Sequence, residues 1–126
     1  MVIHIKLIGL TAAAHDDPLG RTWFGYDPAA TPEELWDNNR GDYRLDAARI
    51  AVERWAALNY QGQVVLVAEL EGAKYEVLTG MPGTPKKALL GHVLQDGDPI
   101  HDALIGTQIT YDSRNSIQYG QDPQLG

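Results

Sequence analysis

The chain has 126 residues, of which 44% are apolar and 21% charged, and its net charge is −7 at pH 7. This length and composition predict one folded domain with one hydrophobic core, and they exclude an intrinsically disordered chain. The lack of cysteine excludes disulfides, thiolate metal ligands and a cysteine nucleophile, and the acidic charge disfavours indiscriminate binding to nucleic acid or anionic membranes.

The first forty residues predict a strand, a long loop and a short helix. Polar and apolar residues alternate over residues 2–10, as in a half-exposed strand. Residues 11–30 hold two Pro, two Gly and three Asp, which predict a loop with a short strand at 22–26. Thr31 and Glu34 then form the capping box of a helix that the following Asn-Asn-Arg-Gly ends.

The apolar N-terminal run does not have the pattern of a targeting segment. It is short, it alternates, and no basic region precedes it, so we do not expect a signal peptide. No segment reaches the roughly 18 apolar residues of a membrane-spanning helix. We therefore expect a cytoplasmic protein with no membrane partner.

The rest of the chain predicts a second helix followed mainly by strands. Asp46 is a good N-cap for an Ala-rich helix that carries Ile50, and either Val52 or Trp55, into the core. From Trp55 onward the period changes to two, and a turn at 61–62 predicts a hairpin. The further predicted segments are a turn at 71–72, strands at 74–78, 87–94, 108–111 and 116–119, a loop at 80–85, and a helical turn within 97–106 that Gly106 ends.

These elements predict a single α+β domain. It covers residues 1–120, and residues 121–126 form a peripheral tail. The strands are joined mostly by turns, which favours a small, curved, mostly antiparallel β-barrel with two or three short helices.

The densest group of planar polar and aromatic side chains is the segment WDNNRGDYRL. Such amides, guanidinium groups and rings suit phosphates, base edges and stacking on a base. The structural alternative is a helix C-terminus with its Trp in the core and its second Arg paired with a neighbouring Asp. The two are compatible, because a capping segment can also line a pocket. The candidate ligand-binding residues of this segment are Trp36, Asn39, Arg40, Tyr43 and Arg44.

Two other stretches supply further candidates for ligand binding. Trp23 belongs to the cluster TWFGY, which suits either a stacking site or the core. Arg114 and Asn115 precede the last predicted strand, which can close beside the first strand if the sheet curls. Their structural alternative is a turn that Asn115 supports through its side chain.

No metal-binding or catalytic motif is recognisable. The four His show no helical or hairpin metal spacing apart from adjacent pairs such as His101-Asp102, and adjacent side chains of a strand point to opposite faces. Glu69 and Glu71 share a strand face, which is more typical of a solvent-exposed face than of a catalytic pair. We therefore predict no metal site, no cofactor and no catalytic residue, and the motif search favours a protein that is not an enzyme.

Five short segments follow one another in a familiar order. They are NRGDYRL (39–45), RIAVERWA (49–56), YQGQV (60–64), GHV (91–93) and NSIQY (115–119). Over residues 30–119 the chain resembles the PUA-like superfamily, the group that includes the PUA, ASCH, EVE and YTH domains. The resemblance implies a curved β-barrel with helices at its ends and a pocket that receives a base, often a modified one. It also implies a bacterial protein linked to restriction, defence or RNA metabolism.

Three functions stay open at this point. The first is non-enzymatic binding of nucleic acid or a nucleotide, with the candidate residues at the mouth of a pocket. The second, implied by the ASCH-type relatives, is a small hydrolase acting on a modified nucleoside, for which Lys6, Thr22 and Glu69 are the available Lys-Thr-Glu set. The third is an acidic protein–protein interaction or accessory module.

Overall fold

The computed structural model describes residues 1–126 except 42, 44, 46, 79–85, 112–113 and 124–126. The elements are β1 (Val2–Leu7), β2 (Thr11–Ala12), β3 (Trp23–Phe24), α1 (Pro32–Asn39), α2 (Ala47–Ile50), β4 (Trp55–Tyr60), β5 (Gln63–Leu78), β6 (Lys86–Val93), α3 (Pro99–Leu104) and β7 (Ile117–Gly120). Within this described part, no helix has the length and apolar character needed to cross a membrane.

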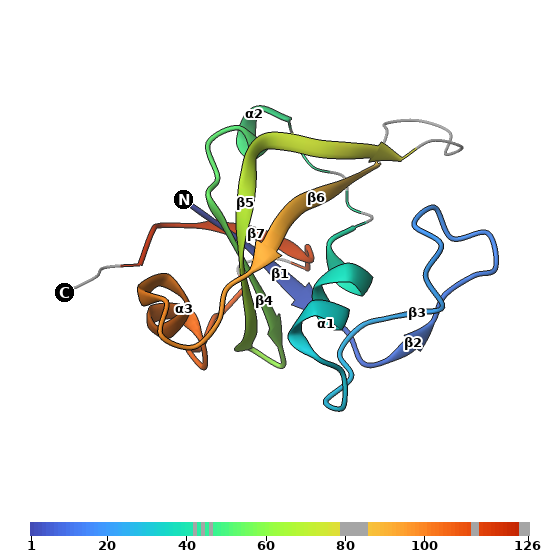
Figure 1. Cartoon of the computed structure of the whole chain (residues 1–126), viewed down its shortest axis with the longest axis horizontal. Coiled ribbons are helices and arrows are strands. Elements are labelled where there is room, and N and C mark those ends of the chain that lie inside the picture. Colours follow the sequence, from blue (N-terminus) through green and yellow to red (C-terminus); the bar gives the residue numbers. More distant parts are fainter. Residues whose placement is uncertain (42, 44, 46, 79–85, 112–113, 124–126) are drawn as a thin grey trace.

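Five of the strands form one curled sheet in the order β6-β5-β4-β1-β7. β1 runs parallel to β4, while the other three neighbouring pairs are antiparallel. The sheet is a half-barrel, and β2 and β3 form a separate pair beyond α1 (Figure 1). The predicted α+β class with a curved, mostly antiparallel sheet and short helices is therefore confirmed, although the sheet does not close into a full barrel.

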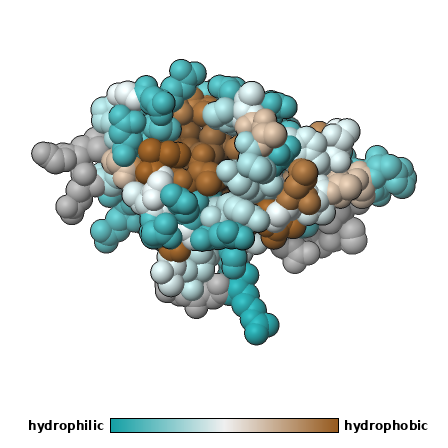
Figure 2. Space-filling view, turned by 90° about the horizontal axis from the view of Figure 1, so that it is seen from below, coloured by the Kyte–Doolittle hydropathy of each residue, from teal (hydrophilic) through white to brown (hydrophobic). Residues whose placement is uncertain are grey.

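The two faces of the sheet bury two separate apolar clusters. Ile3 and Ile5 of β1 pack in the larger cluster with Trp36 of α1. Val2 belongs to the smaller cluster, together with Leu104 of α3. This division follows from the period of two along a strand, which sends successive side chains to opposite faces. Seen from below, part of the apolar surface lies in a recess framed by hydrophilic residues (Figure 2).

Helix α1 begins and ends as its sequence predicts. The Thr31 hydroxyl accepts a hydrogen bond from the Glu34 N–H at 3.2 Å, and the Glu34 carboxylate accepts one from the Thr31 N–H at 3.0 Å. The capping box is therefore confirmed, and it satisfies two backbone donors that the first turn leaves unpaired. The last helical residue is Asn39, and Arg40 is the C-cap.

Helix α2 is shorter than the Ala-rich segment predicts. It ends at Ile50, which is fully buried, and the predicted N-cap at residue 46 lies outside the described residues. Trp55 is buried, but it belongs to β4, where it pairs with Val2 of β1. Val52 is exposed. The predicted change to a period of two at Trp55 is therefore confirmed, and the helix ends before this strand begins.

The predicted turn at 71–72 is wrong, because β5 continues as one strand of 16 residues. The register with β6 shifts between Leu70 and Tyr75, so the irregularity is absorbed as a bulge rather than a reversal of the chain. Gly91 faces this bulge, where a Cβ atom would lie 2.3 Å from the Glu69 carbonyl oxygen. The strand can therefore bend here only because β6 has no side chain at that position.

The C-terminal elements follow the predicted order with one exception. β6, α3 and β7 occupy the predicted segments within a few residues. The predicted strand at 108–111 is reduced to an isolated bridge between Gln63 and Gln108. The predicted loop at 80–85 and residues 124–126 of the tail lie outside the described residues.

The β4–β5 hairpin is confirmed and reverses through Gln61 and Gly62, whose φ angles are 52° and 83°. Two consecutive positive φ values define a type I′ turn, and a left-handed conformation costs a non-glycine residue about 1–2 kcal/mol. We expect Gln61→Gly to raise the free energy of unfolding by about 0.5–1 kcal/mol, because glycine avoids that cost. Urea denaturation of Gln61→Ala, which keeps a Cβ atom, is the matched control; equal stabilities of the two variants would contradict the turn.

Candidate functional site

A small pocket opens at the carboxyl end of β1, where the sheet meets β3 and α1. Its volume is about 130 Å³. Separate parts of the chain contribute to its wall, and we call it the β1 pocket. The lining residues that matter for its chemistry are Lys6, Phe24, Gly25, Asn39, Tyr43 and Ser116.

Asn39 joins α1 to the wall of the β1 pocket. Its side-chain oxygen accepts a hydrogen bond from the Gly25 N–H at 2.9 Å, and its amide group donates to the Gly25 carbonyl at 2.9 Å. The same amide group donates to the Leu35 carbonyl at 3.0 Å. Both donor positions of this buried side chain are thus occupied. Asn39 therefore holds the wall in place, rather than offering donors to a ligand.

Gly25 is the point at which three segments meet. Its φ angle is 93°, and a Cβ atom there would lie only 2.3 Å from the Gly9 carbonyl oxygen. The next residue, Tyr26, donates its N–H to the Ile8 carbonyl at 2.8 Å. Both the backbone angle and the lack of space exclude a side chain at position 25. Only a glycine there lets the segment after β1 lie this close to the segment that Asn39 holds.

Arg21 fixes the long loop against the C-terminal end of α1. It pairs with Asp17 at 2.7 Å, with both side chains largely buried, and it donates to the Gly41 carbonyl at 2.6 Å. This ion pair lowers the pKa of the Asp17 carboxyl, chiefly through the hydrogen bond from Arg21. The guanidinium group also lies over the Phe24 ring, 5.2 Å from its centroid. Arg21 precedes α1 in the sequence, and the last turn of α1 holds no basic residue, so no local signal predicts this cation at the helix C-terminus.

Arg40 and Tyr43 attach the segment after α1 to the edge of β6. Arg40 pairs with Glu76 at 2.8 Å and donates to the Leu89 carbonyl at 3.1 Å. The backbone of Tyr43 exchanges two hydrogen bonds with that of Lys87. The Tyr43 hydroxyl donates to the Asn39 carbonyl at 2.7 Å, which orients the ring at the pocket wall.

Lys6 is the charged residue among those that line the β1 pocket. It is exposed, and its backbone N–H donates to the Ser116 carbonyl at 2.8 Å, which brings the last segment to the pocket. Its ammonium group lies 5.6 Å from the centre of the Tyr111 ring. Buried Asn59 donates to the Tyr111 hydroxyl at 2.6 Å, and burial raises the pKa of that hydroxyl. Tyr111 is therefore a fixed neutral platform beside Lys6.

The other predicted site residues occupy different surroundings. Trp36 is 4% exposed in the larger core cluster, and Trp23 packs partly buried against that cluster. Arg114 and Asn115 are exposed and lie next to Ser116 in the sequence. Arg44 lies outside the described residues. The structure thus brings Asn39 and Tyr43 together in the wall of one pocket and keeps Trp36 in the core.

The Lys-Thr-Glu set of the hydrolase hypothesis does not converge in the sheet. The strand register places Glu69 opposite Trp55, which in turn lies opposite Val2. Lys6 is four residues further along β1, which corresponds to about 13 Å along the strand. Thr22 is exposed just before β3. Lys6 and Glu69 are therefore too far apart to act on one bond in this arrangement.

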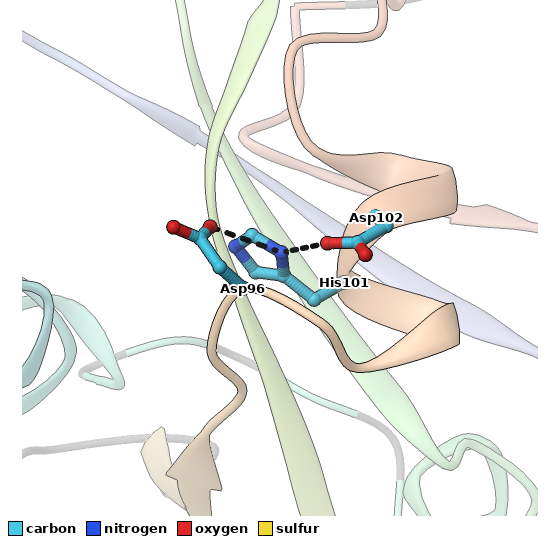
Figure 3. A group of neighbouring side chains, drawn as sticks. All are labelled: Asp96, His101 and Asp102. Atoms are coloured by element: carbon cyan, nitrogen blue, oxygen red, sulfur yellow. Dashed lines mark hydrogen bonds and ion pairs between the residues drawn. The ribbon is translucent and has the colours of Figure 1, made fainter.

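A second pocket, of about 340 Å³, lies between the start of α1 and the loop that precedes α3. We call it the α3 pocket; Glu33, Gln95, Asp96 and His101 contribute polar groups to its lining. His101 Nδ1 lies 3.0 Å from Asp102 Oδ1 and 3.8 Å from Asp96 Oδ1 (Figure 3). The adjacency of His101 and Asp102 did not predict this cluster, because adjacent side chains point apart in a strand, whereas these two residues lie on a helical turn.

Comparison with known proteins provides no further assignment. No protein-family model, curated protein or solved structure matches the chain. The site must therefore be interpreted from its own residues.

The two consecutive asparagines of α1 allow a matched test of the wall. We expect Asn39→Ala to lower the free energy of unfolding by about 2–4 kcal/mol, because it leaves the buried Gly25 N–H and C=O without partners. Asn38→Ala, which removes only one bond to the Glu34 carbonyl, is expected to cost less than about 1 kcal/mol. Equal losses in urea denaturation would show that Asn39 does not hold the wall.

Proposed function

We propose that this protein is a non-enzymatic, PUA-like binding domain that accepts a single nucleobase or nucleotide in the β1 pocket. The observation that supports the proposal is that three separate segments of the chain meet at one pocket. Three stretches rich in aromatic or polar residues lie far apart in the sequence, yet Phe24, Tyr43 and Ser116, one from each, line the same pocket. Capping and core packing account for Asn39 and Trp36, but they do not require the three stretches to meet.

The size of the pocket limits the ligand to one small group. At about 130 Å³ it is smaller than the roughly 300 Å³ at which typical ligand sites begin. Phe24 and Tyr43 provide aromatic surface, against which any base can pack in a sequence-tolerant way. Lys6 and Ser116 add one residue with a charged donor and one with a hydroxyl group to the lining. Together, the two aromatic residues and the two polar residues suit a flat, polar ring with an adjacent anionic group.

The charges favour a nucleotide over a long strand of nucleic acid. Arg21 and Arg40 are engaged with Asp17 and Glu76, so these guanidinium groups already have acidic partners. The net charge of −7 opposes the multiple phosphate contacts that give nucleic-acid backbones their affinity. A base flipped into the pocket, or a free nucleotide, needs only the local positive charge of Lys6.

Replacing Lys6 by Met tests this proposal, because the substitution keeps the aliphatic stem and removes the ammonium group. Isothermal titration with the common nucleoside monophosphates and their base-methylated forms should identify at least one ligand of the unaltered protein. We expect Lys6→Met to weaken its binding about tenfold to a hundredfold, as for the loss of a charged hydrogen bond.

Lys74→Met is the matched control, since Lys74 is an exposed lysine of β5 that does not line the β1 pocket. It should bind as the unaltered protein does, and both variants should unfold at the same temperature as that protein. The proposal is wrong if no nucleotide or methylated nucleotide binds, or if both substitutions change the affinity equally.

A further inference from the structure

A group of metal-ligating side chains that the nucleotide proposal does not use lies at the edge of the α3 pocket, and two of its members, Asp96 and His101, line the pocket. His101 Nδ1, a carboxylate oxygen of Asp96 and a carboxylate oxygen of Asp102 all lie within 4.8 Å of one another. The three side chains come from the end of the loop after β6 and from the first turns of α3, and they turn toward one another (Figure 3).

The distances between the ligand atoms are close to those that one bound ion imposes. Two atoms bonded to the same ion at about 2.0–2.2 Å lie about 3.0–3.5 Å apart in tetrahedral or octahedral geometry. His101 Nδ1 lies 3.0 Å from Asp102 Oδ1, where the two form a hydrogen bond whose proton an ion would replace, and 3.8 Å from Asp96 Oδ1. Asp96 is fully exposed, so a small rotation of its side chain closes the remaining gap.

The imidazole is held in position before any ion arrives. The His101 side chain is only 10% exposed, and its ring lines the α3 pocket. Asp98 caps the helix by accepting hydrogen bonds from the N–H groups of Ile100 and His101, at 2.8 and 3.3 Å. Asp102 accepts a further hydrogen bond from the Gly97 N–H at 3.3 Å. The imidazole and the Asp102 carboxylate are thus both held in place, and only the exposed Asp96 has to be ordered on binding.

The pocket provides space for the rest of the coordination shell. Its volume of about 340 Å³ exceeds what one ion needs, and Glu33 and Gln95 add oxygen atoms to the same lining. Among the described residues, the ion pairs found for Asp96 and Asp102 involve only His101. The carboxylates thus carry negative charge into the site without a lysine or arginine to neutralise it.

We propose that Asp96, His101 and Asp102 bind one divalent first-row transition-metal ion, such as Zn²⁺, at the edge of the α3 pocket. One imidazole nitrogen with two carboxylate oxygens suits this class, whereas Ca²⁺ and Mg²⁺ prefer shells made of oxygen alone. With Nδ1 as the ligand, the imidazole is neutral and keeps its proton on Nε2. The remaining positions face the pocket and are open to water or to a small anionic ligand.

Titration of the chelator-treated full-length chain with Zn²⁺ tests the proposal, with the heat of binding as the readout. We expect one Zn²⁺ per chain, and at least about tenfold weaker binding for Asp96→Asn and for Asp102→Asn. Asp37→Asn, an exposed aspartate of α1, is the matched control and should bind as the unaltered protein does. Titration with Co²⁺ adds a spectrum that reports the number of ligands around the ion.

Asp96 is exposed, so Asp96→Asn should unfold at the same temperature as the unaltered protein when no metal is present, whereas Asp102→Asn alters the hydrogen bonds with Gly97 and His101 and is required only to remain folded. Loss of Zn²⁺ binding in folded variants therefore supports the site. Equal Zn²⁺ affinity in all variants would assign the binding to other histidines and overturn the proposal. Absence of a single-equivalent Zn²⁺ site in the unaltered protein, or tighter binding of Ca²⁺ than of Zn²⁺, would overturn it as well.

Discussion

The double hydrogen bond between the side chain of Asn39 and the backbone of Gly25 is the interaction on which the architecture around the β1 pocket depends. It ties the last turn of α1 to the strand pair β2–β3, and Gly25 in turn contacts the end of β1. An amide is suited to this task, because it can donate and accept toward one residue at the same time. Replacing it with an aliphatic side chain would leave two buried backbone groups without partners.

This constraint explains why the segment WDNNRGDYRL has such an unusual composition. Trp36 fills the core, Asn39 holds Gly25, Arg40 pairs with Glu76, and the backbone of Tyr43 extends the edge of β6. Asn39 and Arg40, two of the planar polar residues of its described part, therefore have structural partners. The same contacts bring the Tyr43 ring to a pocket beside Lys6, so structural and binding roles coexist within one segment.

The local sequence predicted those elements whose structure depends on a single segment of the chain. The capping box of α1, the reversal at Gln61-Gly62 and the alternation of β1 all depend on neighbours in the sequence. The prediction was wrong where a distant strand decides: β5 runs through the expected turn because β6 supplies Gly91 opposite the bulge. The change to a period of two at Trp55 is confirmed, since β4 begins there and pairs with β1.

In the candidate sites, too, residues that the local sequence indicates differ from residues that distant contacts bring in. Asn39 and Tyr43 stood out by composition, whereas Arg21 and the His101 cluster depend on contacts that no spacing rule predicts. Arg21 reaches carbonyl oxygens about twenty residues away. Asp96 meets His101 only because the loop between β6 and α3 folds back. The β1 pocket and the α3 pocket have different chemistry, since the first offers a lysine and aromatic rings, and the second offers carboxylates and an imidazole.

The most direct test of the binding proposal is to map backbone amide chemical shifts while a nucleotide is titrated into the labelled protein. The account predicts that the largest changes occur at Lys6, Gly25, Tyr43 and Ser116, with little change in α3. Changes centred on α3, or spread evenly over the surface, would contradict the β1 pocket as the place where the ligand binds.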